Sequence, residues 1–198
     1  MKRLSAILLA LPLVLTGARS EEEETLPQQR ERIVSYLTAT HSPTLVDESE
    51  VDTESQQAFY TTLGNTVYRY IDNYYDPARP GRTEVTASSK VTITFRAYVF
   101  NFANITDSTF PFYSNDPLLK SAYEEMGLTS GAWSFEPLQI DMRSGNIIKG
   151  LRLALLGCRQ GDEVEAYMTY NMAYGDTNFS TIARESPLAW FFTVDAVE

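Results

Sequence analysis

The sequence has few of the residues on which most catalytic chemistry and most metal sites depend. It contains one cysteine, Cys158, and one histidine, His41, among 198 residues. A single cysteine excludes a disulfide within the chain and a cysteine-rich metal cluster. Cys158 follows Leu155 and Leu156, so we expect a small buried residue rather than a reactive thiol. His41 lies in a polar stretch, where the sequence indicates no partner for it.

Positive charge is also scarce. Lys and Arg number 16 against 26 Asp and Glu, which gives a formal net charge of -10. A nucleic acid partner is therefore not expected, because neutralising phosphates requires a basic surface. An acidic, water-exposed surface is the simplest interpretation of this charge.

The chain lacks a long apolar run, but a short one stands at its start. Lys2 and Arg3 precede an apolar stretch over residues 4–15, and small residues follow up to Ser20. This order is typical of a signal peptide, and we assign one to residues 1–20. The apolar stretch is too short to span a bilayer comfortably, so no stable membrane insertion is expected.

The end of this segment also bears on lipid attachment. Leu15-Thr16-Gly17 resembles the start of a bacterial lipobox, but Ala18 stands where the lipidated cysteine would have to be. We therefore expect a protein exported to the periplasm or cell envelope without a lipid anchor.

Residues 21–56 are interpreted as an N-terminal extension that precedes the main domain. After an acidic tether, Thr25 is a suitable helix cap, and Ile33, Tyr36 and Leu37 recur at helical spacing up to about residue 39. Residues 40–56 are polar and predict a linker. The main domain is then assigned to residues 57–198.

Strand patterns begin near Phe59. Residues 67–71 alternate between Val, Arg or Ile and Tyr, and residues 91–96 alternate between apolar side chains and Thr or Arg. Further strands are expected over residues 138–142, 164–170 and 188–197. For the tyrosines at 68, 70, 74 and 75, packing within the sheet is favoured over a binding surface.

Two helices are expected within the main domain. Asp116 can cap a helix that starts at Pro117, and Gly127 is placed to end it. Trp133 and Phe135 are expected to pack under this helix. A second, central helix carries one apolar stripe, formed by Ile148, Leu151 and Leu155.

The most informative motifs lie in the last third of the chain. They are Ile147-Ile148-Lys149-Gly150-Leu151, continuing through Leu155-Leu156-Gly157-Cys158-Arg159-Gln160-Gly161, and then Ala173-Tyr174-Gly175. Their order and spacing resemble the core of FKBP-type peptidyl-prolyl isomerases, in particular exported bacterial, Bacteroidetes-like members with an N-terminal extension.

The resemblance implies an α+β fold, in which a curved antiparallel β-sheet wraps around a short central helix. The N-terminal helix and the helix near residues 117–126 are additions to the minimal domain. The resemblance also implies an isomerase that acts on X-Pro bonds of exported proteins and assists their folding. Its partners are proline-containing polypeptides, and it needs no cofactor and no metal.

The same resemblance implies roles for particular residues. The catalytic donors are the Ile148 backbone N–H and the Tyr174 hydroxyl, which bond carbonyls of the substrate. The other substrate-binding positions are Phe95, Phe112, Tyr113, Leu138, Ile147, Leu151, Trp190 and Phe192.

Three of these positions depart from the family pattern. Leu151 stands for a tryptophan, Leu138 for a phenylalanine and Tyr113 for an acidic residue, so reduced activity is expected. Two assignments have alternatives. Thr106-Asp107-Ser108 offers a second register for Phe112-Tyr113, and Trp190 is the alternative to Phe192, which is favoured as the pocket aromatic of the last strand.

Two other functions compete with the isomerase. A binding or chaperone module with weak or no catalysis would keep the groove and hold unfolded segments in it. An envelope assembly subunit would use the N-terminal helix to form a homodimer.

Overall fold

The computed structural model describes residues 25–127 and 134–198, so the segment expected to be a signal peptide and Trp133 lie outside the described residues. The strands are β1 (Val46–Asp47), β2 (Phe59–Leu63), β3 (Val67–Ile71), β4 (Lys90–Val99), β5 (Tyr113–Ser114), β6 (Leu138–Asp141), β7 (Glu163–Met168) and β8 (Leu188–Val197). The α-helices are α1 (Thr25–Ala39), α2 (Lys120–Glu125) and α3 (Lys149–Leu155). The expected α+β class and the expected strands and helices are confirmed.

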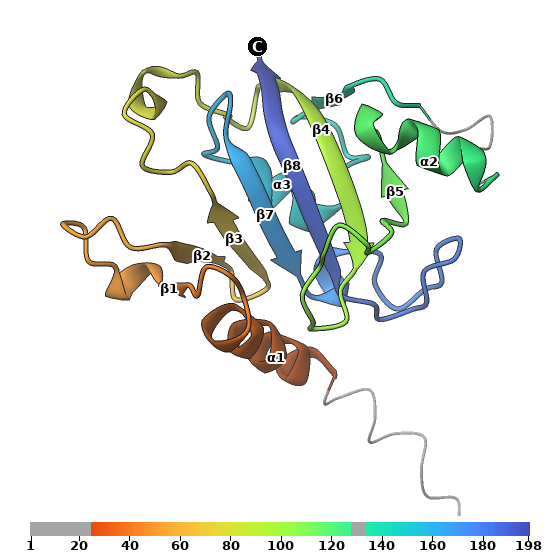
Figure 1. Ribbon diagram of the computed structural model, residues 1–198, viewed down its shortest axis with the longest axis horizontal. Coiled ribbons are helices and arrows are strands. Elements are labelled where there is room, and N and C mark those ends of the chain that lie inside the picture. Colours follow the sequence, from red (N-terminus) through yellow and green to blue (C-terminus); the bar gives the residue numbers. More distant parts are fainter. Residues whose placement is uncertain (1–24, 128–133) are drawn as a thin grey trace, which may run out of the picture.

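One eight-stranded sheet organises the molecule (Figure 1). Its strand order is β1-β2-β3-β7-β8-β4-β5, and β6 also pairs with β4, at residues 90–93, whereas β5 pairs with Arg96 and Ala97. All pairs are antiparallel except β1 with β2, which run parallel, so the expectation of a wholly antiparallel sheet is corrected at this edge. The register of β4 against β8 shifts between Thr92 and Ile93, and such a bulge increases the local bend of a sheet.

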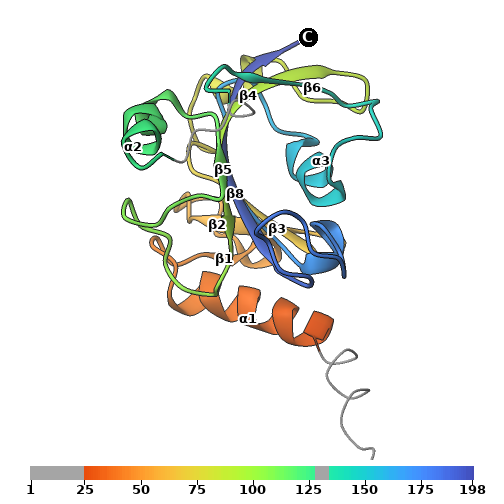
Figure 2. The same ribbon diagram turned by 90° about the vertical axis from the view of Figure 1, so that its right-hand side faces the viewer.

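The helix α3 covers one face of the sheet, which we call the α3 face (Figures 1 and 2). Leu151, Ala154 and Leu155 are buried there against inward residues of the long strands. Gly150 allows this approach. A Cβ atom at position 150 would lie 2.4 Å from Met168 Sδ and 2.9 Å from the carbonyl oxygen of Met172.

The opposite face, which we call the outer face, is aromatic. It carries Tyr68, Tyr70, Tyr98 and Tyr167, all of them buried. The helix α1 crosses the lower end of the sheet and buries Ile33, Tyr36 and Leu37 in this second core (Figure 2). Sheet packing is thus confirmed for Tyr68 and Tyr70. The apolar side of α1 packs on the sheet of the same chain.

The segment after α1 is more ordered than the expected linker. Leu45 is 1% exposed and belongs to the outer core, and β1 then pairs with β2. His41 is also buried, at 5% exposure. The polar composition of residues 40–56 concealed this packing, because the buried positions are separated by exposed ones.

His41 has two partners. Its Nε2 lies 2.8 Å from a carboxylate oxygen of Glu165, and its Nδ1 lies 2.6 Å from the carbonyl oxygen of Pro43. Tyr167 donates its hydroxyl hydrogen to the same Glu165 oxygen. Burial lowers the pKa of His41, but the hydrogen bonds to Glu165 and Pro43 outweigh it, so the pKa is raised above its usual value. Both ring nitrogens face acceptors, an arrangement that suits the imidazolium form.

The added helix begins and ends as expected. Asp116 accepts a hydrogen bond from the Leu118 N–H, a 3₁₀ turn over Pro117–Leu119 leads into α2, and Gly127 follows with a φ of +67°. Tyr123 fastens the helix by donating to the Pro111 carbonyl oxygen over 2.6 Å. Phe135 lies 6.3 Å from Tyr123 between ring centroids, consistent with packing beneath the helix.

Cys158 is fully buried, as expected. Burial raises the pKa of its thiol to about 11, and the thiol donates to the Ala154 carbonyl oxygen over 3.1 Å. The thiolate, which is the reactive form, is therefore not populated at neutral pH. In the part of the chain that the structure describes, no helix has the length and hydropathy to cross a bilayer.

Candidate functional site

A groove of about 410 Å³ opens on the α3 face between α3, β6 and the segment after β7. It is lined by Tyr113, Leu138, Gln139, Ile140, Asp141, Ser144, Asn146, Ile147, Ile148, Leu151, Tyr174, Phe179 and Trp190. Seven of the ten residues proposed from the sequence are among them. Residues that are far apart in the sequence thus meet on one concave surface.

The most deeply buried aromatic residue of the groove comes from β8. Trp190 is 4% exposed and stacks on Phe95, with ring centroids 4.7 Å apart and planes inclined by 26°. Leu151 lines the same groove from α3. The large flat side chain of Trp190 therefore lies on the strand, and the smaller aliphatic Leu151 lies on the helix, at the position where the family pattern has a tryptophan.

The start of α3 presents a backbone donor. Ile148 is the residue before the first turn, with φ -57° and ψ 140°, and it lines the groove. Arg152 holds this turn in place, because its guanidinium donates to the carbonyl oxygens of Met142 and Ser144. Among the described residues, no acceptor bonds the Ile148 N–H. That N–H is available to a carbonyl group of a ligand.

Tyr174 presents a second donor. It precedes Gly175, whose φ of +77° makes the turn, and its ring stacks on Phe179 with centroids 4.1 Å apart and planes inclined by 7°. Burial raises the pKa of Tyr174, and the nearby Tyr113 raises it further, so the hydroxyl keeps its proton at neutral pH. No described side chain or carbonyl hydrogen-bonds to this hydroxyl, which can therefore donate to a ligand.

Residues 122–195 match the family model of FKBP-type peptidyl-prolyl cis-trans isomerases. The matched residues make up less than half of the chain, and this part of the chain is similar to that family. The match includes α3, β7, β8 and the residues between them, which supply most of the groove.

Solved structures show the same fold. The chain is similar to a peptidyl-prolyl cis-trans isomerase from Pseudomonas syringae pv. tomato strain DC3000, with 13% identity and a TM-score of 0.53 over 92% of this chain and 99% of that one. It is also similar to the three FKBP domains of wheat FKBP73, with 14% identity and a TM-score of 0.50 over 71% of this chain and 51% of that one. No curated protein matches the sequence.

Three of the residues proposed from the sequence do not line the groove. Phe95 lies beneath Trp190, and Phe112 packs against Tyr174 with ring centroids 6.4 Å apart. Phe192 is buried in the core, so the preference for Phe192 over Trp190 as the groove aromatic is reversed by the geometry. The two residues share a strand face, and only their distance along β8 from the groove distinguishes them.

The two registers considered for Phe112-Tyr113 lie in different places in the structure. Tyr113 lines the groove, whereas Thr106 and Asp107 lie exposed in the loop after β4. Phe179 and the β6 residues after Leu138 were not identified from the sequence. The alternation of apolar and polar residues along β6 could have indicated the β6 residues. No local pattern indicates Phe179, which lies at the groove in a stack on Tyr174.

The groove carries little charge. Asp141 is its one charged lining residue, and hydrogen bonds from Arg143 hold the pKa of that carboxyl at about 2. Asp141 and Arg143 form an ion pair of 2.8 Å at the rim. The groove is therefore suited to an uncharged, partly apolar ligand with free carbonyl oxygens.

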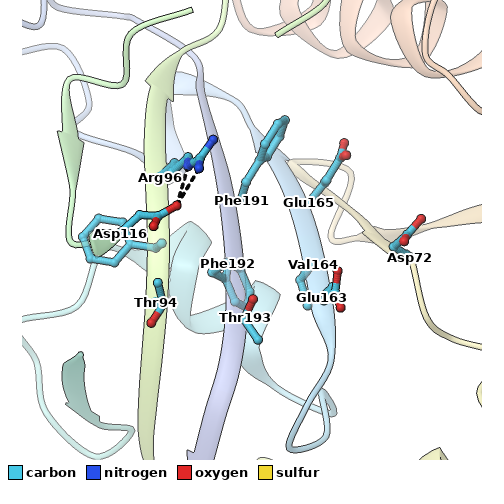
Figure 3. Close-up of a pocket in the computed structure, with 11 residues that line it drawn as sticks. Asp72, Thr94, Arg96, Asp116, Glu163, Val164, Glu165, Phe191, Phe192 and Thr193 are labelled. Carbon is cyan, nitrogen blue, oxygen red and sulfur yellow. Dashed lines mark hydrogen bonds and ion pairs between the residues drawn. The ribbon is translucent and has the colours of Figure 1, made fainter. Parts of the chain in front are cut away.

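A second cavity of about 410 Å³ lies on the outer face and has a different character (Figure 3). Asp72, Glu163 and Glu165 line one side of it, and the Arg96–Asp116 ion pair of 2.6 Å lies on the other. The polar side chains of β4, β7 and β8 that Figure 3 labels belong to this face. The described residues hold no group of three or more histidine, cysteine or acidic side chains that could bind a metal ion.

Proposed function

We propose that the groove on the α3 face isomerises X-Pro peptide bonds. The observation that carries this proposal is the meeting of an apolar lining with two unengaged donors, the Ile148 N–H and the Tyr174 hydroxyl. Leu151 and Trp190 would take the proline ring between them. The donors would hold substrate carbonyls on either side of it.

Such a site suits the chemistry of the reaction. The X-Pro bond rotates through a barrier of about 18–20 kcal/mol, because rotation breaks amide resonance. No covalent bond is made or broken, so no nucleophile, general base or metal is needed. A site that removes water and binds the twisted amide better than the planar one lowers the barrier.

A protease-free assay on a proline-containing peptide tests the activity directly. The folded wild-type protein should relax a displaced cis/trans equilibrium faster than buffer alone, at a rate proportional to enzyme concentration. A rate equal to background with folded protein would remove the isomerase from consideration.

Replacement of Tyr174 by Phe tests the donor role, because it removes only the hydroxyl. A neutral hydrogen bond is worth about 0.5–1.5 kcal/mol, so kcat/KM should fall roughly 2- to 12-fold. Tyr170→Phe is the matched control, since Tyr170 is close in sequence and lies outside the groove lining. Equal rates for Tyr174→Phe and wild type would show that the hydroxyl does not contact the substrate.

A binding module is the second candidate, and the departures at Leu151, Leu138 and Tyr113 favour it. Such a module would hold unfolded segments in the groove without isomerising X-Pro bonds. Suppressed aggregation of a proline-free unfolded client, together with no isomerase rate, would support it over the enzyme.

We also propose that the protein is exported to the cell envelope of a bacterium and binds its polypeptide clients there. The support is the order of residues 1–20 and the alanine at position 18. The mature protein, recovered from a membrane-free extract, should have the mass of the chain without its leader. An acylated product would contradict this.

A further inference from the structure

The N-terminal helix reaches the groove through one buried amide. Gln29 on α1 is 6% exposed. Its Nε2 donates to the carbonyl oxygen of Glu185 over 2.8 Å, and its Oε1 accepts the Tyr170 N–H over 3.0 Å. Both partners belong to the segment between β7 and β8, residues 169–187, which we call the flap. One side chain thus bonds the beginning and the end of the flap.

Two backbone hydrogen bonds complete this connection. The Gly175 N–H donates to the Tyr170 carbonyl oxygen, and the Glu185 N–H donates to the Gly175 carbonyl oxygen, each over 2.9 Å. Gln29, Tyr170, Gly175 and Glu185 therefore form a closed ring of four hydrogen bonds. The Gln29 amide is the only part of this ring that comes from outside the flap.

The ring lies next to the groove in the chain. Gly175 directly follows Tyr174, and Tyr174 stacks on Phe179. At its two ends the flap also bonds the sheet, through Thr169 with the Thr66 carbonyl oxygen and through the Pro187 carbonyl oxygen with the Phe100 N–H, and its tip is held by bonds within itself, such as those of Phe179 with Ile182. Figure 2 shows the start of α1 beneath the flap. The position of Tyr174 relative to the sheet thus depends on how the base of the flap is fastened.

We propose that Gln29 is a positioning residue for the groove. It fixes the flap base from α1, so that the Tyr174 hydroxyl is already placed when a substrate arrives. The catalytic part of this inference rests on the proposed isomerase function. Fastening a loop before binding removes an ordering cost that would otherwise be met by each substrate.

Two variants with one control test the role. Gln29→Leu keeps a buried side chain with one heavy atom fewer beyond Cβ, and it removes both hydrogen bonds. Gln29→Glu keeps the acceptor for the Tyr170 N–H and replaces the donor. Glu31→Gln is the control, because Glu31 is exposed on the same helix. Far-UV and near-UV circular dichroism would verify that each variant is folded.

Hydrogen exchange gives the first readout and needs no activity. Gln29→Leu should speed exchange of the Tyr170, Gly175 and Glu185 amides at least about ten-fold and leave the β4 and β8 amides unchanged. Unchanged exchange at these three amides would overturn the proposal. An inactive wild type with the expected exchange would overturn only the isomerase function and leave the flap fastening intact.

Kinetics gives the second readout. Gln29→Leu should lower kcat/KM about ten-fold, whereas in a Tyr174→Phe background the same change should cost less than about two-fold, because the placed hydroxyl is already absent. Equal losses in both backgrounds would indicate a general structural role and contradict the proposal.

The third readout is whether lowering the pH restores the activity of Gln29→Glu. A protonated carboxyl can donate to Glu185 and accept from Tyr170, as the amide does, so kcat/KM should rise toward the wild-type value as the pH falls. Wild type and Glu31→Gln should show no such rise. The absence of recovery in a folded Gln29→Glu variant would also count against the proposal.

Discussion

The two faces of the sheet use their polar atoms in opposite ways. On the outer face the polar groups bond one another, as His41 and Tyr167 do with Glu165 and Tyr70 does with Asp72. On the α3 face the Ile148 N–H, the Tyr174 hydroxyl and the Trp190 Nε1 have no hydrogen-bond partner among the described residues. Paired groups hold α1 and the sheet together, and unengaged donors leave capacity for a ligand. The following predictions test how far this division extends.

The largest effects are expected from removing buried leucines on either face. Leu37 of the outer core and Leu155 of the α3 core are both fully buried. Each change to Ala should lower the free energy of unfolding by about 2–5 kcal/mol, measured by urea denaturation, with a single transition in both cases. Ser35→Ala, at an exposed site on α1, should change it by less than about 0.5 kcal/mol. An unchanged global transition in Leu37→Ala would show that α1 is a separable appendage.

A smaller effect is expected from adding one methyl group on the α3 face. In an exposed helix Gly→Ala usually stabilises by roughly 0.5–1 kcal/mol. Gly150→Ala should instead lower the free energy of unfolding by about 1–3 kcal/mol, because the added Cβ would collide with Met168 and the Met172 carbonyl oxygen. Gly145→Ala, where no atom lies within 4 Å of the new Cβ, is the control in the same urea series. A neutral or stabilising Gly150→Ala would mean that α3 can move away from β7.

The contrast between paired and unpaired polar groups can be measured with two aromatic substitutions. Tyr167→Phe removes a donor to Glu165 and should cost about 1.5–3 kcal/mol, as expected for a hydrogen bond to a charged group. Trp190→Phe removes an N–H without a described partner and keeps a ring against Phe95, so its cost should stay near or below about 1.5 kcal/mol. Thermal and urea unfolding would compare the two. A larger loss for Trp190→Phe would remove this distinction between the faces.

The smallest effect should be a pH dependence confined to the outer face. The folded-state pKa of His41 is raised above its usual value of 6.5, so its ion pair with Glu165 contributes fully below about pH 6.5. This contribution is lost as the pH rises through the folded-state pKa, and Asp72 nearby acts in the same direction. Unfolding free energies from pH 5 to 9 should show the decline in wild type and not in His41→Gln. Because His41 is the only histidine, its NMR titration identifies the group directly.

Features with a short sequence period were predictable. The alternation in residues 67–71 and 91–96 located β3 and β4, and the helical spacing of Ile33, Tyr36 and Leu37 located α1. The FKBP-like motifs placed Ile148 and Tyr174 on one groove because backbone geometry, rather than side-chain identity, requires most of those residues.

Features that depend on distant partners were not predictable. His41 and Glu165 are 124 positions apart, and Gln29 and Glu185 are 156 apart, so no local pattern connects them. The same reason explains the choice between Trp190 and Phe192. Periodicity tells which residues share a face of β8, whereas the position of the groove along that strand depends on α3 and the flap.

The way α1 is buried also determines when the domain can be completed during synthesis. The helix lies near the beginning of the chain, yet its side chains pack with Tyr167 and Ala189, close to the end. Until these residues have left the ribosome, or have crossed the membrane in an exported chain, Ile33, Tyr36 and Leu37 lack their final cover. The helix α1 is made well before β8 and must therefore wait for it, and a nascent chain that lacks β8 exposes an apolar helix to chaperones and proteases.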